Sequence, residues 1–167
     1  WNFPYLTSLA PVAAAIAAGN TVILKPSELS SNSSKAIHKI ISENFDQNYF
    51  AVVEGGIPET TLLLEQKFDK IFFTGSVEVG KIIYKAASRH LTPITLELGG
   101  KSPAFVTEKC DLKISAKRLI WAKYLNSGQA CTAPDYLLVH TSVKEKFLEL
   151  AKKEIERSDY SFDHGNY

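Results

Sequence analysis

Two side chains in this sequence could carry covalent chemistry, a cysteine and a glutamate. Cys131 follows a run of small and flexible residues, 126–130, which would let a substrate approach the thiol closely. Glu97 lies inside the apolar segment 94–98, where burial of an unpaired carboxylate is costly. Burial favours the neutral form of a carboxyl group and brings it towards the range that suits a general base. The residue types therefore indicate a thiol nucleophile and a general base.

Both residues also have a structural explanation. A single cysteine is more often a small packing residue than a nucleophile, and a buried glutamate can be one half of a structural ion pair. The second cysteine, Cys110, lies near Glu108 and Asp111, whose charges disfavour a thiolate. From these residues alone, both interpretations stay open.

A glycine-containing turn follows one of the predicted strands. Gly75 and Ser76 lie between that strand and a helical pattern that contains Gly80. A strand, a turn and a helix in this order place backbone N–H groups and a helix N-terminus beside any bound phosphate. The spacing of the glycines is not that of the dinucleotide fingerprint, so a plain tight turn explains the pattern as well.

Lys25 and Glu28 follow the first predicted strand, at the edge where ligands of parallel sheets collect. The ammonium group could donate to ribose or phosphate oxygens, and the carboxylate could accept from ribose hydroxyls. A solvated lysine and a glutamate favoured by a helix dipole are the competing explanation.

The elements that would position these residues alternate along most of the chain. Strands are predicted at 21–24, 51–53, 71–73, 94–98, 104–106 and 136–140, and helices at 10–18, 30–44, 58–66, 77–90, 111–125 and 143–157. This alternation predicts an α/β protein with a mostly parallel sheet and helices on both faces. The Gly99-Gly100 pair is the candidate boundary between a domain at 1–99 and another at 100–167.

Composition and charge exclude several classes of protein. The chain is 45% hydrophobic and 22% charged, which excludes disordered and collagen-like proteins. Its 19 basic and 18 acidic side chains nearly cancel, so nucleic acid and anionic lipid are not expected partners. The most apolar stretch, 6–19, is too short to span a membrane and contains Pro11, so it predicts a buried helix.

The two cysteines and four histidines also limit the possibilities. Two cysteines do not make a disulfide framework, and a reducing compartment such as the cytoplasm fits them best. The histidines lack metal-ligand spacing, so no metal site is predicted. The chain has no Met, begins at Trp1 and ends in a polar tail, so we expect an internal piece of a longer protein.

Five motifs occur in the order and spacing of one enzyme family. They are Trp1-Asn2-Phe3-Pro4, Leu24-Lys25-Pro26-Ser27-Glu28, Phe73-Thr74-Gly75-Ser76, Leu96-Glu97-Leu98-Gly99-Gly100-Lys101 and Gly128-Gln129-Ala130-Cys131. Along nearly its whole length the chain resembles the aldehyde dehydrogenase superfamily. The segments 58–63, 90–93 and 133–136 look most like the class 3 branch, which includes fatty and aromatic aldehyde dehydrogenases.

The resemblance implies a role for each catalytic residue. Cys131 attacks the aldehyde carbonyl to give a thiohemiacetal, and the Asn2 amide and the Cys131 backbone N–H hold the developing oxyanion. Hydride transfer to the nicotinamide leaves a thioester. Glu97 then activates the water that releases the carboxylic acid. By itself Asn2 is an ordinary turn residue, so its role depends wholly on the resemblance.

The resemblance also implies a cofactor site in a Rossmann-like domain, at 1–99, followed by the start of an α/β catalytic domain. Lys25 and Glu28 would bind the adenosine ribose, and Gly75, Ser76 and the helix containing Gly80 would face the pyrophosphate. Glu28 should disfavour a ribose 2′-phosphate, so NAD is the expected cofactor, with NADP possible.

Members of this family are dimers or tetramers, and some class 3 members carry a C-terminal membrane anchor, which would lie beyond Tyr167. We expect the 167 residues alone to be inactive, because the family's other cofactor-binding and oligomerising segments are not among them. Two alternatives remain. An acylating dehydrogenase would release the thioester to coenzyme A, and a non-catalytic binding protein would have no use for Cys131 and Glu97.

Overall fold

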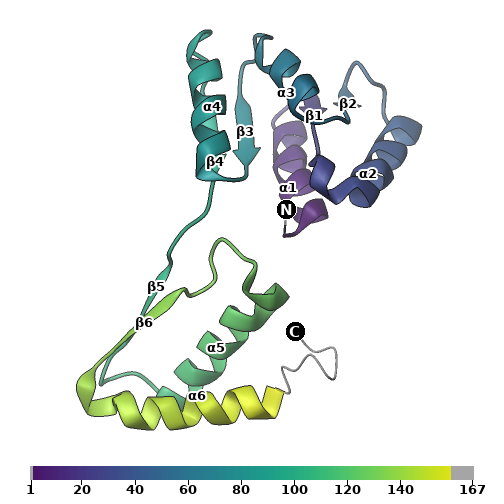
Figure 1. Cartoon of the computed structure of the whole chain (residues 1–167). Coiled ribbons are helices and arrows are strands. Elements are labelled where there is room, and N and C mark those ends of the chain that lie inside the picture. Colours follow the sequence, from purple (N-terminus) through teal and green to yellow (C-terminus); the bar gives the residue numbers. More distant parts are fainter. Residues whose placement is uncertain (1, 159–167) are drawn as a thin grey trace. The chain divides into compact units, whose positions relative to one another are not determined.

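The computed structural model describes residues 2–158, which divide into two compact units (Figure 1). The first unit comprises Phe3–Leu98. The second begins at Gly99 and also includes Asn2, which lies apart from it in the sequence. The change from one unit to the other falls beside the Gly99-Gly100 pair.

The first unit contains four helices and four short strands within its described residues. They are α1 (Pro4–Ala17), β1 (Val22–Leu24), α2 (Ser31–Asn44), β2 (Phe50–Val52), α3 (Ile57–Leu64), β3 (Ile71–Thr74), α4 (Val77–Ser88) and β4 (Ile94–Glu97), with a 3-10 turn at Glu28–Ser30. The strands β1 and β2 pair in parallel, and so do β3 and β4. The helices α2 and α4 are the crossovers that parallel pairing requires.

The second unit continues the alternation of strands and helices. They are β5 (Pro103–Val106), α5 (Leu112–Tyr124), a 3-10 turn (Leu125–Gly128), β6 (Tyr136–Val139), a second 3-10 turn (Thr141–Val143) and α6 (Lys144–Ser158). The strands β5 and β6 are parallel, and α5 packs against α6. Asp111 caps α5, since its side chain accepts a hydrogen bond from the backbone N–H of Ile114 at 2.9 Å. The predicted α/β class is confirmed.

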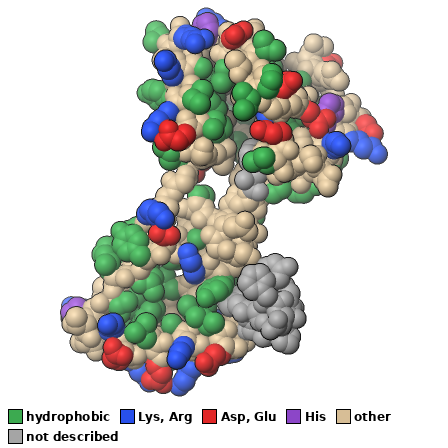
Figure 2. All heavy atoms as spheres, viewed as in Figure 1, with side chains coloured by type: hydrophobic (Ala, Val, Ile, Leu, Met, Phe, Trp, Pro, Cys, Tyr) green, Lys and Arg blue, Asp and Glu red, His purple; other side chains and the backbone are tan. Residues whose placement is uncertain are grey.

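The predicted parallel pairing is confirmed, but the expected cover of helices on both faces was not met within the described residues. The described strands form three separate parallel pairs. The helices α1 and α2 pack against β1 and β2, and α4 packs against β3 and β4. The uncovered faces expose Ile23 (50%), Phe72 (46%) and Phe105 (69%). Each strand-helix-strand unit has one crossover helix, and one helix can cover only one face. Figure 2 shows hydrophobic side chains on the surface of both units.

Each unit nevertheless has its own hydrophobic core. In the first, Ile37 and Ile41 of α2 lie one turn apart and pack with Val12 of α1 and Phe50 of β2. In the second, Phe147 of α6 is fully buried against Val106, Ala116 and Ala151. These cores fix the strand ends, where the candidate functional residues lie.

The first helix differs from the prediction in length and burial. It begins at Pro4, six residues before the expected start, because proline fits the first turn of a helix, where a backbone N–H has no partner. The whole helix was expected to be buried, but only Ser8 and Val12 of α1 are. The helix therefore packs along one face. No helix within residues 2–158 is both long enough and apolar enough to span a membrane.

Candidate active site

Cys131 lies exposed in the loop between the 3-10 turn that follows α5 and strand β6. Its backbone carbonyl accepts a hydrogen bond from Ser102 Oγ at 3.4 Å. The Ser102 carbonyl in turn accepts from the backbone N–H of Asp135 at 3.0 Å. A Cβ at Gly100 would lie 3.5 Å from the Cys131 carbonyl oxygen, which is ordinary contact distance. The segment 100–102 therefore supports the loop, while the thiol stays accessible.

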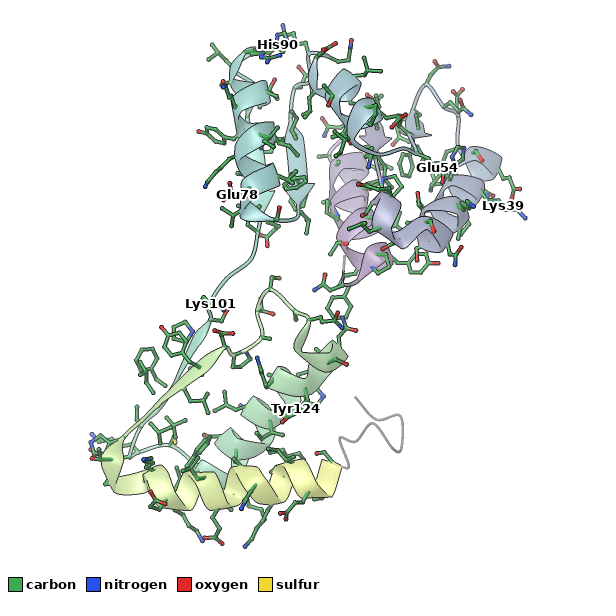
Figure 3. All side chains as sticks on the ribbon, in the orientation of Figure 1. Lys39, Glu54, Glu78, His90, Lys101 and Tyr124 are labelled. Carbon is green, nitrogen blue, oxygen red and sulfur yellow. The ribbon has the colours of Figure 1, made fainter. Side chains whose placement is uncertain are left out.

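The turn before Cys131 has an unusual backbone. Asn126, Ser127 and Gly128 are consecutive left-handed residues, with φ values of 52°, 57° and 75°. Left-handed backbone costs a non-glycine residue roughly 1–3 kcal/mol and persists only where surrounding contacts hold it. A Cβ on Gly128 would lie 3.1 Å from the Lys123 carbonyl oxygen, so a side chain there would meet backbone. Figure 3 labels Tyr124, the last residue of α5, at the entry to this turn.

The side chain of Asn126 holds the turn through two hydrogen bonds. Its Nδ2 donates to the backbone carbonyl of Asn2 at 2.9 Å and to that of Gln129 at 3.4 Å. Gln129 Nε2 donates back to the Asn126 carbonyl at 3.0 Å. The structure thereby brings Asn2, a predicted site residue, together with the turn that leads into Cys131.

Glu97 is the last residue of β4, and its side chain is exposed. The expected burial of this carboxylate was wrong. Successive side chains of a strand point to opposite faces, so Leu96 and Leu98 face α4 whereas Glu97 and its partner Thr74 point away from it. Glu97 belongs to the first unit and Cys131 to the second.

The turn after β3 is bonded to the strand that carries Glu97. The backbone N–H of Gly75 donates to the Glu97 carbonyl at 3.0 Å. Ser76 caps α4, and its Oγ accepts from the backbone N–H of Val79 at 3.3 Å. Gly80 is buried, and a Cβ there would lie 2.9 Å from Leu98 Cδ2, so glycine allows α4 to approach β4 closely. Figure 3 labels Glu78 in the first turn of this helix.

Lys25 and Glu28 form an ion pair directly after β1. Lys25 Nζ donates to Glu28 Oε2 at 2.9 Å. The hydrogen bond from Lys25 is the main reason why the pKa of Glu28 lies below its usual value, so this carboxylate is ionised at neutral pH. The Lys25 side chain is only 16% exposed, so the explanation as a freely solvated lysine was wrong.

Two residues that support the Cys131 loop were not predicted, Asn126 and Ser102. The signal for Asn126 is present in the sequence, since Asn-Ser-Gly after a helical pattern is typical of a left-handed helix end. The signal for Ser102 is absent, because a long-range bond from a serine to a backbone carbonyl leaves no local pattern.

Comparisons with known proteins agree with the motifs. Residues 1–163 match the family described as "Aldehyde dehydrogenase family". The chain is 48% identical to mouse "Aldehyde dehydrogenase family 3 member A2" over 156 residues, which are 93% of this chain and 32% of that protein. It is 49% identical to rat "Aldehyde dehydrogenase, dimeric NADP-preferring" over 156 residues, 93% of this chain and 34% of that protein.

A solved structure agrees as well. The substrate-bound Staphylococcus aureus AldH superposes with a TM-score of 0.92 at 46% identity, and the match covers 99% of this chain and 36% of that one. The chain thus spans about a third of the length of the relatives that it matches. The similarity to a family 3 member agrees with the class 3 branch that the segments 58–63, 90–93 and 133–136 predicted. From the match along nearly all of its residues, the chain belongs to the aldehyde dehydrogenase family.

Proposed function

We propose that the complete protein oxidises an aldehyde to a carboxylic acid with NAD(P), and that Cys131 is the nucleophile. The main support is the exposed thiol of Cys131 at the end of a strained turn that is bonded to Asn2. Attack of the thiolate on the aldehyde carbon forms a thiohemiacetal and places negative charge on the former carbonyl oxygen. The Asn2 amide and the Cys131 backbone N–H are the proposed donors to that oxygen.

The remaining steps need a hydride acceptor and a base. Bound NAD(P) would supply the acceptor, and loss of hydride from the thiohemiacetal would leave a thioester on Cys131. Glu97 is the proposed base that takes a proton from the water attacking this thioester. Its carboxylate is accessible at the carboxyl end of β4, where ligands of parallel sheets collect.

The first unit has a set of donors and acceptors that fits a dinucleotide. The ammonium group of Lys25 and the ionised carboxylate of Glu28 could bond ribose hydroxyls at the end of β1. The turn at Gly75 and Ser76 opens the twelve-residue helix α4, whose N-terminal N–H groups favour a phosphate, and Gly80 keeps that helix close to β4. We therefore propose 1–99 as part of the cofactor domain and 100–167 as part of the catalytic domain.

Glu28 should set the preference between the two cofactors. A negative carboxylate beside the adenosine ribose repels a 2′-phosphate, so we propose NAD as the preferred cofactor. In Glu28→Gln the repulsion is lost while one acceptor oxygen stays, and two charges about 4 Å apart near a surface interact strongly enough to change affinity at least ~10-fold. We expect the ratio of kcat/KM for NADP to that for NAD to rise about tenfold.

The measurement is initial rates of both cofactors with one aldehyde. Glu43→Gln, an exposed change on α2, is the matched control and should leave the ratio unchanged. A ratio that stays constant in Glu28→Gln would place the determinant elsewhere.

The reaction itself is tested in the complete protein encoded by the reading frame that contains this chain. We expect NAD reduction with a medium-chain aldehyde and release of the free acid without coenzyme A. Formation of an acyl-CoA that depends on added coenzyme A would instead support an acylating dehydrogenase. Absence of turnover with either cofactor across aldehydes would leave a non-catalytic role.

The assembly and location of the complete protein are also proposals. We propose a homodimer or homotetramer, and the rat relative that is named dimeric supports the homodimer. The two free thiols, Cys110 and Cys131, support a reducing compartment and therefore the cytoplasm.

A further inference from the structure

The turn at 126–128 joins two parts of the second unit that are far apart in the sequence. Asn126 and Asn2 are separated by 124 positions, yet the Asn126 amide and the Asn2 carbonyl are 2.9 Å apart. The same amide group lies 3.4 Å from the carbonyl of Gln129, two residues before Cys131. One –NH₂ group therefore links the backbone of Asn2 to the loop that carries the thiol.

The backbone of the turn depends on this side chain. Asn126 and Ser127 both have positive φ, and asparagine is among the few residues that tolerate this conformation. The return bond from Gln129 Nε2 to the Asn126 carbonyl closes a small ring of hydrogen bonds around the turn. Asn126 thus fixes the turn from both its backbone and its side chain.

We propose that Asn126 is a positioning residue for the oxyanion donors, and that it acts through Asn2 and through the Cys131 loop. This inference rests on the proposed function. The two donors to the oxyanion, the Asn2 amide and the Cys131 N–H, come from segments that are distant in sequence, so their spacing needs a tie between the segments. An oxyanion donor acts only when it is held where the charge develops. Asn126 makes that tie through the backbone carbonyls of Asn2 and Gln129.

Asn126→Asp isolates the donor. Aspartate has the same shape and also tolerates positive φ, but its ionised side chain has no N–H to donate to the Asn2 or Gln129 carbonyl. We expect kcat for aldehyde oxidation in the complete protein to fall about tenfold with KM changed less than about twofold. This loss is smaller than the ~10²–10³-fold that removal of an oxyanion donor itself causes.

Two measurements separate positioning from a general loss of structure. In the Asn2→Ala background, Asn126→Asp should lower kcat far less than in the parent, because the residue through which it acts is already gone. Hydrogen exchange of peptides covering Asn2 and 126–131 should be faster in Asn126→Asp. The matched control is Asn44→Asp, because Asn44 Nδ2 also donates to a backbone carbonyl, that of Ile40 at 2.8 Å. It should change neither kcat nor exchange in those peptides.

The possible results are distinguishable. If the parent oxidises aldehydes and Asn126→Asp keeps kcat within about twofold, the inference is overturned and the proposed function stands. Equal losses in the parent and Asn2→Ala backgrounds would also overturn it, since Asn126 would then act independently of Asn2. If the parent does not oxidise aldehydes, the proposed function falls and the inference falls with it.

Discussion

Cys131→Ser is expected to abolish aldehyde oxidation by the complete protein, lowering kcat at least ~10³-fold. A serine hydroxyl has nearly the same size as the thiol, but at neutral pH it is almost entirely protonated and is a much weaker nucleophile than a thiolate. Cys131 is exposed and its loop is held through the backbone, by Ser102 and by the turn at Asn126. The substitution should therefore leave the loop intact and remove only the nucleophile.

Cys110→Ser is the matched control, because it makes the same atomic change at the other thiol. Cys110 is half-buried and packs against the core of the second unit, so its loss should affect stability slightly and kcat little. Both variants are compared by NADH formation and by mass spectrometry after treatment with iodoacetamide. The assignment of Cys131 would be wrong if its serine variant kept full activity, or if Cys110 alkylated as fast as Cys131 in the parent.

Much of the local structure could be predicted because it depends on local patterns. Ile37, Ile40 and Ile41 predicted one apolar face for α2, and Ile37 and Ile41 are buried there whereas Ile40 is exposed. The β-branched run at β1 ended as expected at Leu24. The arrangement of the strands was harder to predict, because pairing depends on ladder bonds between distant segments. Alternation of elements indicates parallel pairs, but it does not reveal which strands join or which faces are covered, as the exposed Phe105 illustrates.

In the candidate site, too, local features could be predicted from the sequence and long-range contacts could not. The sequence identified four candidate functional residues, Cys131, Glu97, Lys25 and Glu28. It did not reveal what surrounds their side chains. Glu97 was expected to be buried because its neighbours are apolar. Apolar neighbours at alternate positions lie on the opposite face of a strand, so they say nothing about the face to which the carboxylate points. The bond from Asn126 to Asn2 joins residues 124 positions apart and has no local signal.

Glu97→Gln should separate the two halves of the proposed reaction. Glutamine cannot accept a proton from water, so hydrolysis of the thioester should slow by about 10²–10⁴-fold, the usual contribution of a general base. Formation of the thioester does not need this base in the proposed scheme. We therefore expect a rapid burst of NADH, close to one equivalent per Cys131, followed by slow turnover. Stopped-flow absorbance at the NADH band measures both phases in one experiment.

The exposure of Glu97 makes this test clean, because no described side chain depends on its carboxylate for an ion pair or a hydrogen bond that the substitution would break. Only its backbone carbonyl supports the turn, by accepting from Gly75, and glutamine keeps that carbonyl. Glu65→Gln, exposed at the end of α3, is the control and should show the parent's kinetics. A Glu97→Gln variant without a burst would mean that Glu97 acts before hydride transfer, as a base for the thiol. A variant with normal turnover would assign the activation of water to another residue.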